Sequence, residues 1–374
     1  MFSRFGVVRR DGVAGLSLIK RSDCLVFFFR DGKLHCKNYL TGIEVRTAPI
    51  VVSVLQALGR WCASRKVERL LAGYSPVSIR RTLAKLRRHT LLLYKNSAQA
   101  RQEALLGVWK VWGDEARFFH FATKHAFSSG KVVDERRFTR ALLRKRPQPA
   151  QLKRYPGARQ IPLPAAPAVP LGEFERVLLS RRTHRRFARG GISLEQVSRI
   201  LNLTWGIQGY LHWPGLGQLL LKTSPSGGAR HPVEVYVFAL RVAGLARGVY
   251  HYRADHNSLE LLHREASEDR LVSMCAGQEW IRHCSALFVM TAVLPRVMWR
   301  YHFSRAYRVV LLEAGHFCQT FCLVATRLGL APFCTAALVD PKLEKELGVD
   351  GASETVLYAA GVGRKMSRGQ GSME

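Results

Sequence analysis

Two short segments combine cations, hydroxyls and glycines at spacings that could hold a flat, phosphorylated ligand. In Ser-Arg-Arg-Thr-His-Arg-Arg-Phe, residues 180–187, alternate positions place Arg181, Thr183 and Arg185 on one side of an extended or turning backbone. Guanidinium and hydroxyl groups that converge in this way suit a phosphate. In Ser-Pro-Ser-Gly-Gly-Ala-Arg, residues 224–230, the paired glycines remove two side chains. An aromatic ring could therefore lie against the backbone while the serine hydroxyl and the amides hydrogen-bond its edge.

Together with Gly361-Val362-Gly363-Arg364-Lys365, these segments resemble the nitroreductase-like flavoproteins. That family has a phosphate-binding Arg-Arg-Ser/Thr-x-Arg-x-Phe segment, which residues 181–187 match. The resemblance implies FMN as the cofactor, with the arginines on its phosphate, the glycine turn on its pyrimidine edge and a small-residue turn at 329–332 over its ring. The cofactor-binding candidates are Arg181, Arg182, Thr183, Arg185, Pro225, Ser226, Gly227, Gly228, Arg230, Gly329, Leu330 and Arg364, with Lys365 as an alternative to Arg364.

Further segments resemble one subgroup, the azoline dehydrogenases, which oxidise thiazoline and oxazoline rings of ribosomally made peptides to azoles. The match covers about residues 173–365 and rests on 224–232, 248–252, 305–316 and 361–363. The resemblance implies that a ring carbon gives a hydride to the flavin while a base takes the adjacent proton. It also implies a modified precursor peptide as substrate, a cyclodehydratase as a further partner, and a homodimer in which two chains share each flavin site.

The catalytic candidates are Tyr301, Arg300 and His302. Azoline dehydrogenases have a Lys-Tyr pair ahead of an Arg-Ala-Tyr-Arg segment, and the matching pair here is Arg300-Tyr301. Arginine keeps its charge at neutral pH, so Arg300 cannot act as a general base, although it could stabilise a developing anion or grip the peptide backbone. Tyr301 could accept or donate a proton, and His302 is the nearest imidazole. A cleft mouth that contributes shape alone is the alternative interpretation.

Three function classes remain open. The leading hypothesis is an FMN-dependent dehydrogenase of peptide azolines. A second is a reductase of nitro, quinone or dehydroamino groups that uses a nicotinamide donor and the same flavin. A third is a non-catalytic module that binds DNA or docks a peptide, which the arginine at position 300 keeps open. The sequence has no Gly-x-Gly-x-x-Gly motif after a first strand, so it gives no support to a nicotinamide-type Rossmann fold.

The composition fits two folded units and an anionic partner. With 374 residues, of which 47% are hydrophobic, the chain can fill one sizeable core and a smaller one. The formal net charge of +31 indicates nucleic acid, a membrane surface or an acidic peptide, without choosing among them. Arginines are spread along the whole chain, and a generally arginine-rich composition explains the charge equally well.

The eight cysteines contain no Cys-x-x-Cys pair. Cys318 and Cys322 lie one helical turn apart in an apolar segment, and we expect reduced, mostly buried thiols and no metal. A zinc site would need distant residues to converge, for instance Cys318 and Cys322 with His316, and plain packing is favoured over it. Glu313 and His316 share one helix face, where we expect structural rather than catalytic roles.

The first 96 residues predict a winged-helix-like domain, with short strands, an Asp31-Gly32 hairpin, three helices and a returning strand at 91–94. The third helix, from Ser75 on, is basic. It would suit a DNA groove, or a peptide that adds as a strand to the sheet edge, as in leader-peptide recognition domains. A solvated basic helix on a scaffold domain is the third interpretation. The catalytic domain behind it favours a peptide over nucleic acid.

We predict an α+β fold in which a nitroreductase-like FMN domain has a mixed, antiparallel-leaning sheet flanked by helices. Its stretch at 205–217 is expected to be a loop and residues 329–332 a turn. The segments are 1–96 (winged-helix-like peptide recognition), 97–148 (helical connector), 149–172 (Pro/Ala-rich linker), 173–366 (FMN domain) and 367–374 (disordered tail).

We expect a cytoplasmic protein that does not enter a membrane. The chain turns polar at Arg9-Arg10-Asp11, before any apolar run of an export signal. The longest later apolar runs, at 48–59 and 285–295, are too short to span a bilayer.

Overall fold

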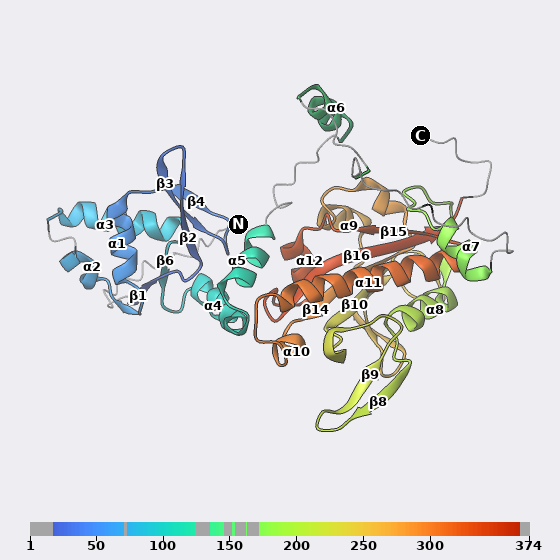
Figure 1. Cartoon of the computed structure of the whole chain (residues 1–374). Coiled ribbons are helices and arrows are strands. Elements are labelled where there is room, and N and C mark those ends of the chain that lie inside the picture. Colours follow the sequence, from blue (N-terminus) through green and yellow to red (C-terminus); the bar gives the residue numbers. More distant parts are fainter. Residues whose placement is uncertain are drawn as a thin grey trace, which may run out of the picture. The chain divides into compact units, whose positions relative to one another are not determined.

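The computed structural model describes residues 18–70, 73–124, 135–145, 152–153, 162 and 172–366 (Figure 1). The chain divides into two compact units, Met1–Thr123 and Lys124–Glu374. Most of the linker predicted at 149–172, and all of the tail predicted at 367–374, lie outside the described residues. The segment boundaries predicted from the sequence stay predictions.

The first unit contains two small antiparallel sheets and a set of helices. Its elements are β1 (Leu18–Arg21), β2 (Leu25–Arg30), β3 (Lys33–Asn38), β4 (Glu44–Arg46), α1 (Pro49–Ala57), β5 (Cys62–Ala63), α2 (Arg65–Leu70), α3 (Pro76–Arg88), β6 (Leu92–Tyr94), α4 (Ala98–Leu105), η1 (Leu106–Val111) and α5 (Asp114–Thr123). The sheets run β5-β1-β6 and β2-β3-β4. Asp31 and Gly32, with φ of 49° and 68°, form the predicted hairpin turn between β2 and β3. The winged-helix assignment itself stays a prediction.

Local sequence signals explain where the helices of this unit begin and what they bury. Helix α3 begins at Pro76, where the Ser75 hydroxyl accepts a hydrogen bond from the Ser78 amide at 3.2 Å. In α5, His120 is buried and stacks on Trp109 with ring centroids 4.7 Å apart. His120 is therefore a packing residue in the core of this unit.

The second unit is a three-layer structure. Its elements are α6 (Glu135–Lys145), α7 (Glu173–Ser180), β7 (Ile192–Ser193), α8 (Leu194–Trp205), β8 (Gly209–Trp213), β9 (Gly217–Leu221), η2 (Gly227–Ala229), β10 (Val233–Ala239), β11 (Val242–Ala243), β12 (Gly248–Arg253), β13 (Ser258–His263), α9 (Glu268–Met274), η3 (Glu279–His283), β14 (Ala286–Val293), α10 (Pro295–Met298), α11 (Ala306–Arg327), β15 (Leu330–Thr335), α12 (Asp340–Leu347) and β16 (Glu354–Arg364). Six antiparallel strands run in the order β13-β12-β10-β14-β16-β15.

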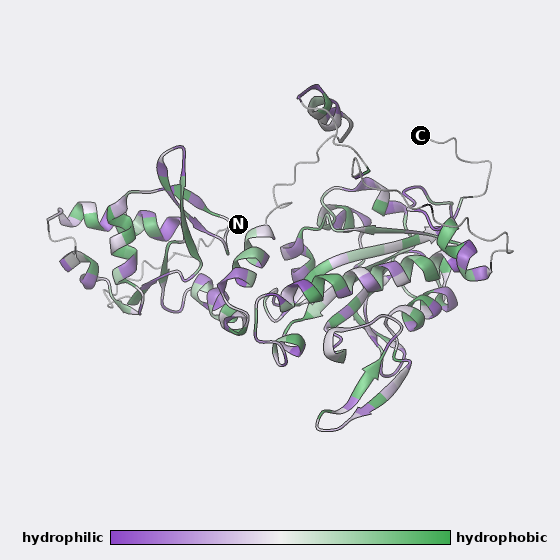
Figure 2. Cartoon of the chain, in the orientation of Figure 1, coloured by the Kyte–Doolittle hydropathy of each residue, from purple (hydrophilic) through white to green (hydrophobic). Residues whose placement is uncertain are grey.

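The central strands are buried on both faces, and their side chains alternate between two cores. In β10, Val235 and Val237 pack with α8 and α11, whereas Tyr236 and Phe238 pack with α9 and α12. Figure 2 shows hydrophobic colour along the central strands and alternating hydrophilic and hydrophobic colour along α11. The sheet is thus sandwiched between helices, and it is antiparallel throughout its six strands.

Two segments predicted as a loop and a turn are strands instead. The stretch at 205–217 contains β8 and the start of β9, which pair as a hairpin around Gly215 and Gly217, with φ of 79° and 76°. Of residues 329–332, only Gly329 is a turn residue, with φ 71°, because β15 begins at Leu330. Glycine content concealed both strands, since glycine is more typical of loops.

Helix α11 is the longest apolar element of the described chain. By length and composition alone its 22 residues would suffice to cross a membrane, although the sequence predicted no apolar run of that length. Phe317 and Phe321 are fully buried against the sheet and α8, whereas Val309, Leu311 and Leu312 are exposed. The helix therefore buries one face in the core and leaves apolar side chains on the other.

Candidate functional site

The Ser-Gly-Gly turn, which includes η2, lies between β9 and β10 and has unusual backbone angles. Gly228 has φ 61°, and Ala229 and His231 have φ 52° and 43°. Left-handed angles cost non-glycine residues about 1–2 kcal/mol each, so surrounding contacts must hold this turn. Strain of this kind is often stored at functional sites, which makes the turn a candidate.

A buried carboxyl group from α11 holds the turn in place. The Ser226 hydroxyl donates to Glu313 Oε2 and accepts from the His231 amide, each at 2.8 Å. Glu313 and His231 are 2% and 5% exposed, and His231 Nδ1 lies 4.0 Å from Glu313 Oε1. The one hydroxyl proton of Ser226 is thus used within the chain, which leaves a ligand its remaining lone pair and the backbone amides.

We predict structural roles for both Glu313 and His316. The contacts of Glu313 with the turn agree with this prediction. The predicted shared face is wrong, because His316 is exposed whereas Glu313 is buried. No local pattern in the sequence indicated the bond between Ser226 and Glu313, which joins residues 87 positions apart.

Burial changes the ionisation of three groups beneath the turn. Burial raises the pKa of Glu313 to about 7, against the opposing effects of the Ser226 hydroxyl and the Lys222 charge. Burial, followed by the charge of Lys222, lowers the pKa of His231 to about 4. Burial also lowers the pKa of Lys222 itself. Near neutral pH, His231 is therefore uncharged and Glu313 is close to its titration midpoint.

Two of the three predicted catalytic residues lie against this turn. A methyl group placed on Gly228 would lie 2.5 Å from the Tyr301 hydroxyl oxygen and 3.1 Å from Arg300 Cδ. Only glycine leaves room for both side chains. His302 is exposed, and its Nε2 lies 3.2 Å from the Trp299 carbonyl oxygen of its own loop. The structure thus brings Arg300 and Tyr301 to the turn, whereas the contact it gives His302 is local.

Arginines brace the turn from its outer side. Arg230 Nε donates to the Gly228 carbonyl oxygen at 2.8 Å, and its guanidinium carbon lies 5.3 Å from the Trp299 ring centroid. Arg296 donates to the His231 carbonyl oxygen at 3.0 Å. Pro225 is exposed at the start of the turn. Permanent positive charge therefore surrounds the predicted flavin-edge segment.

The predicted phosphate segment runs along the end of the sheet. The His184 amide donates to the Pro332 carbonyl oxygen in β15, and the Ala188 amide donates to the Arg364 carbonyl oxygen in β16, both at 2.9 Å. These bonds bring Arg364 beside the segment, as predicted. Phe187 completes the motif: a methyl group on Gly363 would lie 2.5 Å from its ring.

Cations gather along this segment. After burial, the charges of Lys365 and Arg181 lower the pKa of His184, so both cations lie close to it. Thr183, between Arg181 and His184, is exposed. The arrangement gives a phosphate two cations and a hydroxyl at one place.

Two further arginines of the motif contact the chain itself. Arg182 Nη1 donates to the Leu179 and Arg181 carbonyl oxygens at 2.9 Å and 2.8 Å. The Arg185 guanidinium carbon lies 5.7 Å from the Trp280 ring centroid. Both side chains are exposed and retain further N–H donors for a ligand.

Gly329 and Leu330 lie beside the phosphate segment, because Leu330 pairs with Arg364 between β15 and β16. Gly329 is exposed and could meet a ligand through its backbone. Leu330 is 5% exposed and packs in the core. The strand that begins there turns its side chain inward, which leaves the backbone of Leu330 to meet a ligand, and its place at the cofactor stays a prediction.

The two groups of candidates lie at opposite ends of α11. A methyl group on Gly227 would contact Val309, in the first turn of α11, at 2.9 Å, whereas Gly329 follows the last residue, Arg327. At 1.5 Å per residue, the 18 positions from Val309 to Arg327 span about 27 Å. The two groups therefore lie apart within a single chain, and the predicted common cavity, which allowed for a second copy of the chain, stays a prediction.

Comparison with known proteins decides the family. The nitroreductase family model matches residues 178–364, which is 187 of the 374 residues. The chain belongs to the nitroreductase family. This confirms the predicted α+β nitroreductase-like fold and the assignment as an oxidoreductase of a family that generally binds flavin.

Three relatives show how far the likeness extends. A Methanocaldococcus jannaschii protein assigned by name to the nitroreductases is 30% identical over 194 residues, which cover 52% of this chain and 92% of the relative. The trifolitoxin-processing protein TfxB of Rhizobium leguminosarum bv. trifolii is 29% identical over 45% of this chain and 46% of its own length. The microcin B17-processing protein McbC of Escherichia coli is 29% identical over 34% and 48%. This chain therefore matches about half the length of the two peptide-processing relatives.

Proposed function

We propose that this nitroreductase-family chain is an FMN-dependent dehydrogenase that oxidises thiazoline or oxazoline rings of a ribosomally made peptide to azoles. The similarity to TfxB and McbC, which process trifolitoxin and microcin B17, supports a peptide substrate. The observation that carries the proposal is the packing of Arg300 and Tyr301 against Gly228. This packing puts a permanent cation and a phenol where the family would hold its flavin edge.

The residues present fit FMN. Gly228 is exposed and has no side chain, so a ring edge can approach the backbone of the turn beside Tyr301 and Arg300, and the segment from Arg181 to Arg185 with Lys365 offers cations and a hydroxyl for a phosphate. When bound, FMN would supply the acceptor for a hydride. The chain's own part is to bind the phosphate, to orient the ring edge against the turn and to exclude water from it.

A second copy of the chain would complete each site. A twofold axis beside the middle of α11 and perpendicular to it would pack two copies of that helix antiparallel, so the Gly228 turn of one copy would face the Arg181 segment of the other. The outer face of α11 suits such a contact, because Leu312 is 64% exposed and, among the described residues, no atom lies within 4 Å of a methyl group added to Gly315. A homodimer would thus bring together what one chain holds apart.

Azoline oxidation removes one hydride and one proton from adjacent ring positions, and the proton needs an acceptor. Arg300 remains protonated, so its role would be to stabilise negative charge that develops on the ring or to hold the peptide backbone. Tyr301 would be the proton-handling group, with its hydroxyl oxygen placed at the turn. His302 would take part only if substrate binding moved its loop.

The test uses the full-length chain with a synthetic peptide that contains one thiazoline. We expect a yellow protein and the loss of two hydrogens from the peptide mass, with oxygen consumed in step. The Tyr301→Phe variant should keep its flavin spectrum and lose at least tenfold in turnover, whereas Phe303→Leu, in the same loop, should not. Flavin bleaching by NADPH without peptide oxidation would establish the reductase alternative, and a colourless wild type would refute the proposal.

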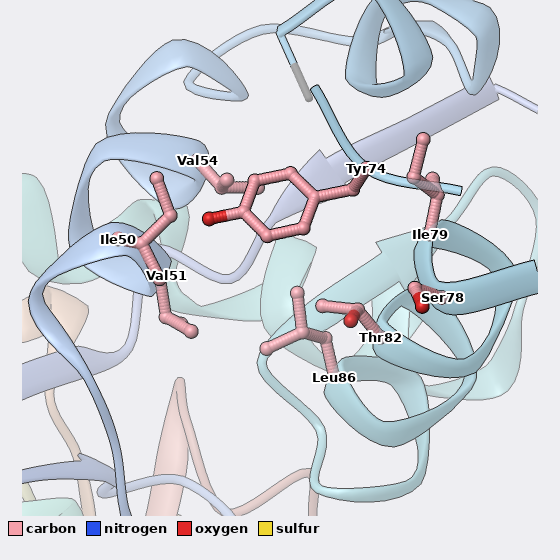
Figure 3. A pocket seen from close by; sticks show the side chains of 8 residues that line it. All are labelled: Ile50, Val51, Val54, Tyr74, Ser78, Ile79, Thr82 and Leu86. Atoms are coloured by element: carbon pink, nitrogen blue, oxygen red, sulfur yellow. The ribbon is translucent and has the colours of Figure 1, made fainter. Parts of the chain in front are cut away.

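We further propose that the first unit docks the substrate peptide. Figure 3 shows Tyr74, Leu86 and the α1 residues Val51 and Val54 around a cavity between α1 and α3. The volume of this cavity is about 130 Å³. An apolar cavity near 150 Å³ can hold a benzene ring, so this one fits one aliphatic or aromatic side chain.

The charge beside the cavity favours an acidic peptide around that anchor side chain. The outer face of α3 is basic, and its exposed cations are Arg80, Arg81, Lys85, Arg87 and Arg88. Thr82→Trp should fill the cavity and weaken the binding of a labelled acidic peptide that contains one leucine at least tenfold. Val77→Trp, at a position 49% exposed on the same helix, is the matched control. Tighter binding of duplex DNA than of any acidic peptide would contradict the assignment.

A further inference from the structure

Three cysteines converge near the C-terminal end of α11, on the side of the fold where the predicted phosphate segment lies. Cys318 and Cys322 lie one turn apart on α11, and Cys334 reaches them from β15. Their three sulfur atoms all lie within 4.8 Å of one another. Among the residues that the structure describes, no other three His, Cys, Asp or Glu side chains gather in this way. All three are free thiols.

The spacing matches the coordination of a thiophilic ion. Zinc–sulfur bonds are about 2.3 Å long, so sulfur atoms around a tetrahedral zinc ion lie about 3.8 Å apart. Sulfur atoms already within 4.8 Å of one another need only small side-chain rotations to reach that geometry. Three protein ligands leave a fourth position open, and Cys334 is partly exposed, so water can reach it.

The polar surroundings also point to an ion rather than to apolar packing. The Tyr358 hydroxyl lies close enough to the Cys334 sulfur to act on it, and an outer neighbour of this kind can orient a metal ligand. The Arg181 charge acts on both Cys322 and Cys334. Three thiolates and one Zn²⁺ carry a net charge of −1, which this guanidinium would offset. Buried cysteines that only fill space have no need of either neighbour.

We propose that Cys318, Cys322 and Cys334 bind one Zn²⁺ ion, with water in the fourth position. Binding releases three thiol protons to solvent. The ion links α11 to β15, two residues beyond Pro332, whose carbonyl oxygen accepts the His184 amide. It would thereby fix the strand on which the phosphate segment rests. This proposal does not depend on the flavin or on the substrate.

The test starts from the full-length chain, expressed with added zinc and purified without chelator. Elemental analysis should find about one zinc per chain, and cobalt(II) in its place should give a thiolate charge-transfer band in the near ultraviolet. Cys334→Ser should lower zinc affinity at least tenfold. Cys62→Ser, at another partly exposed cysteine, should leave zinc content and the cobalt band unchanged.

A measurement on the wild type keeps the test valid if Cys334→Ser fails to fold. In zinc-loaded protein, peptides with Cys318, Cys322 and Cys334 should resist alkylation while Cys62 reacts, and chelator should expose Cys334 to the reagent. A zinc-free protein without a cobalt band overturns the proposal. So does a disulfide among the three cysteines in the freshly purified chain, or copper in place of zinc.

Discussion

Replacement of Glu313 by glutamine should make the second unit more stable, and increasingly so as the pH rises. Glu313 is buried, its Oε2 accepts from the Ser226 hydroxyl at 2.8 Å, and its Oε1 has no hydrogen-bond partner among the described residues. A glutamine oxygen can accept the same bond without carrying charge. The substitution therefore removes a buried charge and keeps the contact that holds the turn.

The magnitude follows from the pKa of the carboxyl group. Burial raises this pKa from 4.5 to about 7, which at about 1.4 kcal/mol per pKa unit corresponds to about 3 kcal/mol. Below pH 4.5 the group is protonated in both states and has no effect. Between these values the unfolded chain loses its proton while the folded chain keeps it, so wild-type stability falls as the pH rises. Above pH 7 the whole penalty applies.

Scanning calorimetry of the full-length chain between about pH 5 and pH 8 would measure the difference, within the range where proteins are usually most stable. About 3 kcal/mol corresponds to roughly 6–12 °C in the unfolding temperature of a unit of this size. The gain should grow with pH and be confined to the transition of the second unit. Glu279→Gln, at an exposed glutamate, is the control and should change little. If the unfolding temperatures of Glu313→Gln and wild type differed by the same amount at every pH, the reasoning would be refuted.

Three further results are expected. Arg181→Ala combined with Arg185→Ala should give a folded but colourless protein by absorbance and circular dichroism, and a retained flavin spectrum would refute the phosphate assignment. Gly228→Ala should lose about 1–2 kcal/mol by thermal unfolding because of its left-handed angle, and turnover should fall because the new methyl group displaces Tyr301; unchanged turnover would count against the site. Gly315→Arg should give a monomer without flavin by light scattering, and a yellow monomer would contradict the shared site.

Local patterns in the sequence were enough to find both halves of the candidate site. The cations from Arg181 to Arg185 lie in one short segment, and the glycines at 227 and 228 are adjacent. The chemistry of each group can therefore be predicted without knowledge of the fold. The match of Arg300-Tyr301 to a catalytic pair depended on the family resemblance, and the structure places both side chains at Gly228. Short segments of this kind are predictable because spacing alone fixes which side chains are neighbours.

Contacts between distant segments could not be predicted in the same way. Cys334 meets Cys318 only because β15 pairs with β16 in one register under α11, and a shift by one residue would turn its side chain to the other core. The bond between Ser226 and Glu313 depends likewise on how β10 and α11 pack. The distance between the two halves of the site follows from the length of α11. It can be estimated only after the structure has shown that each half lies at one end of this helix.

The charges around the Ser-Gly-Gly turn are arranged in two layers, and this arrangement bears on the reaction. Beneath the turn, burial favours the neutral form of Glu313, His231 and Lys222. Against its outer side lie Arg230 and Arg300, which stay charged at every accessible pH. The arginines therefore keep a positive charge on the outer side of the turn at every pH, whereas the charge beneath it changes as Glu313 ionises near pH 7. In the proposed reaction, such cations would stabilise negative charge that develops as a proton leaves a ring carbon, so an arginine can assist at position 300 without acting as the base.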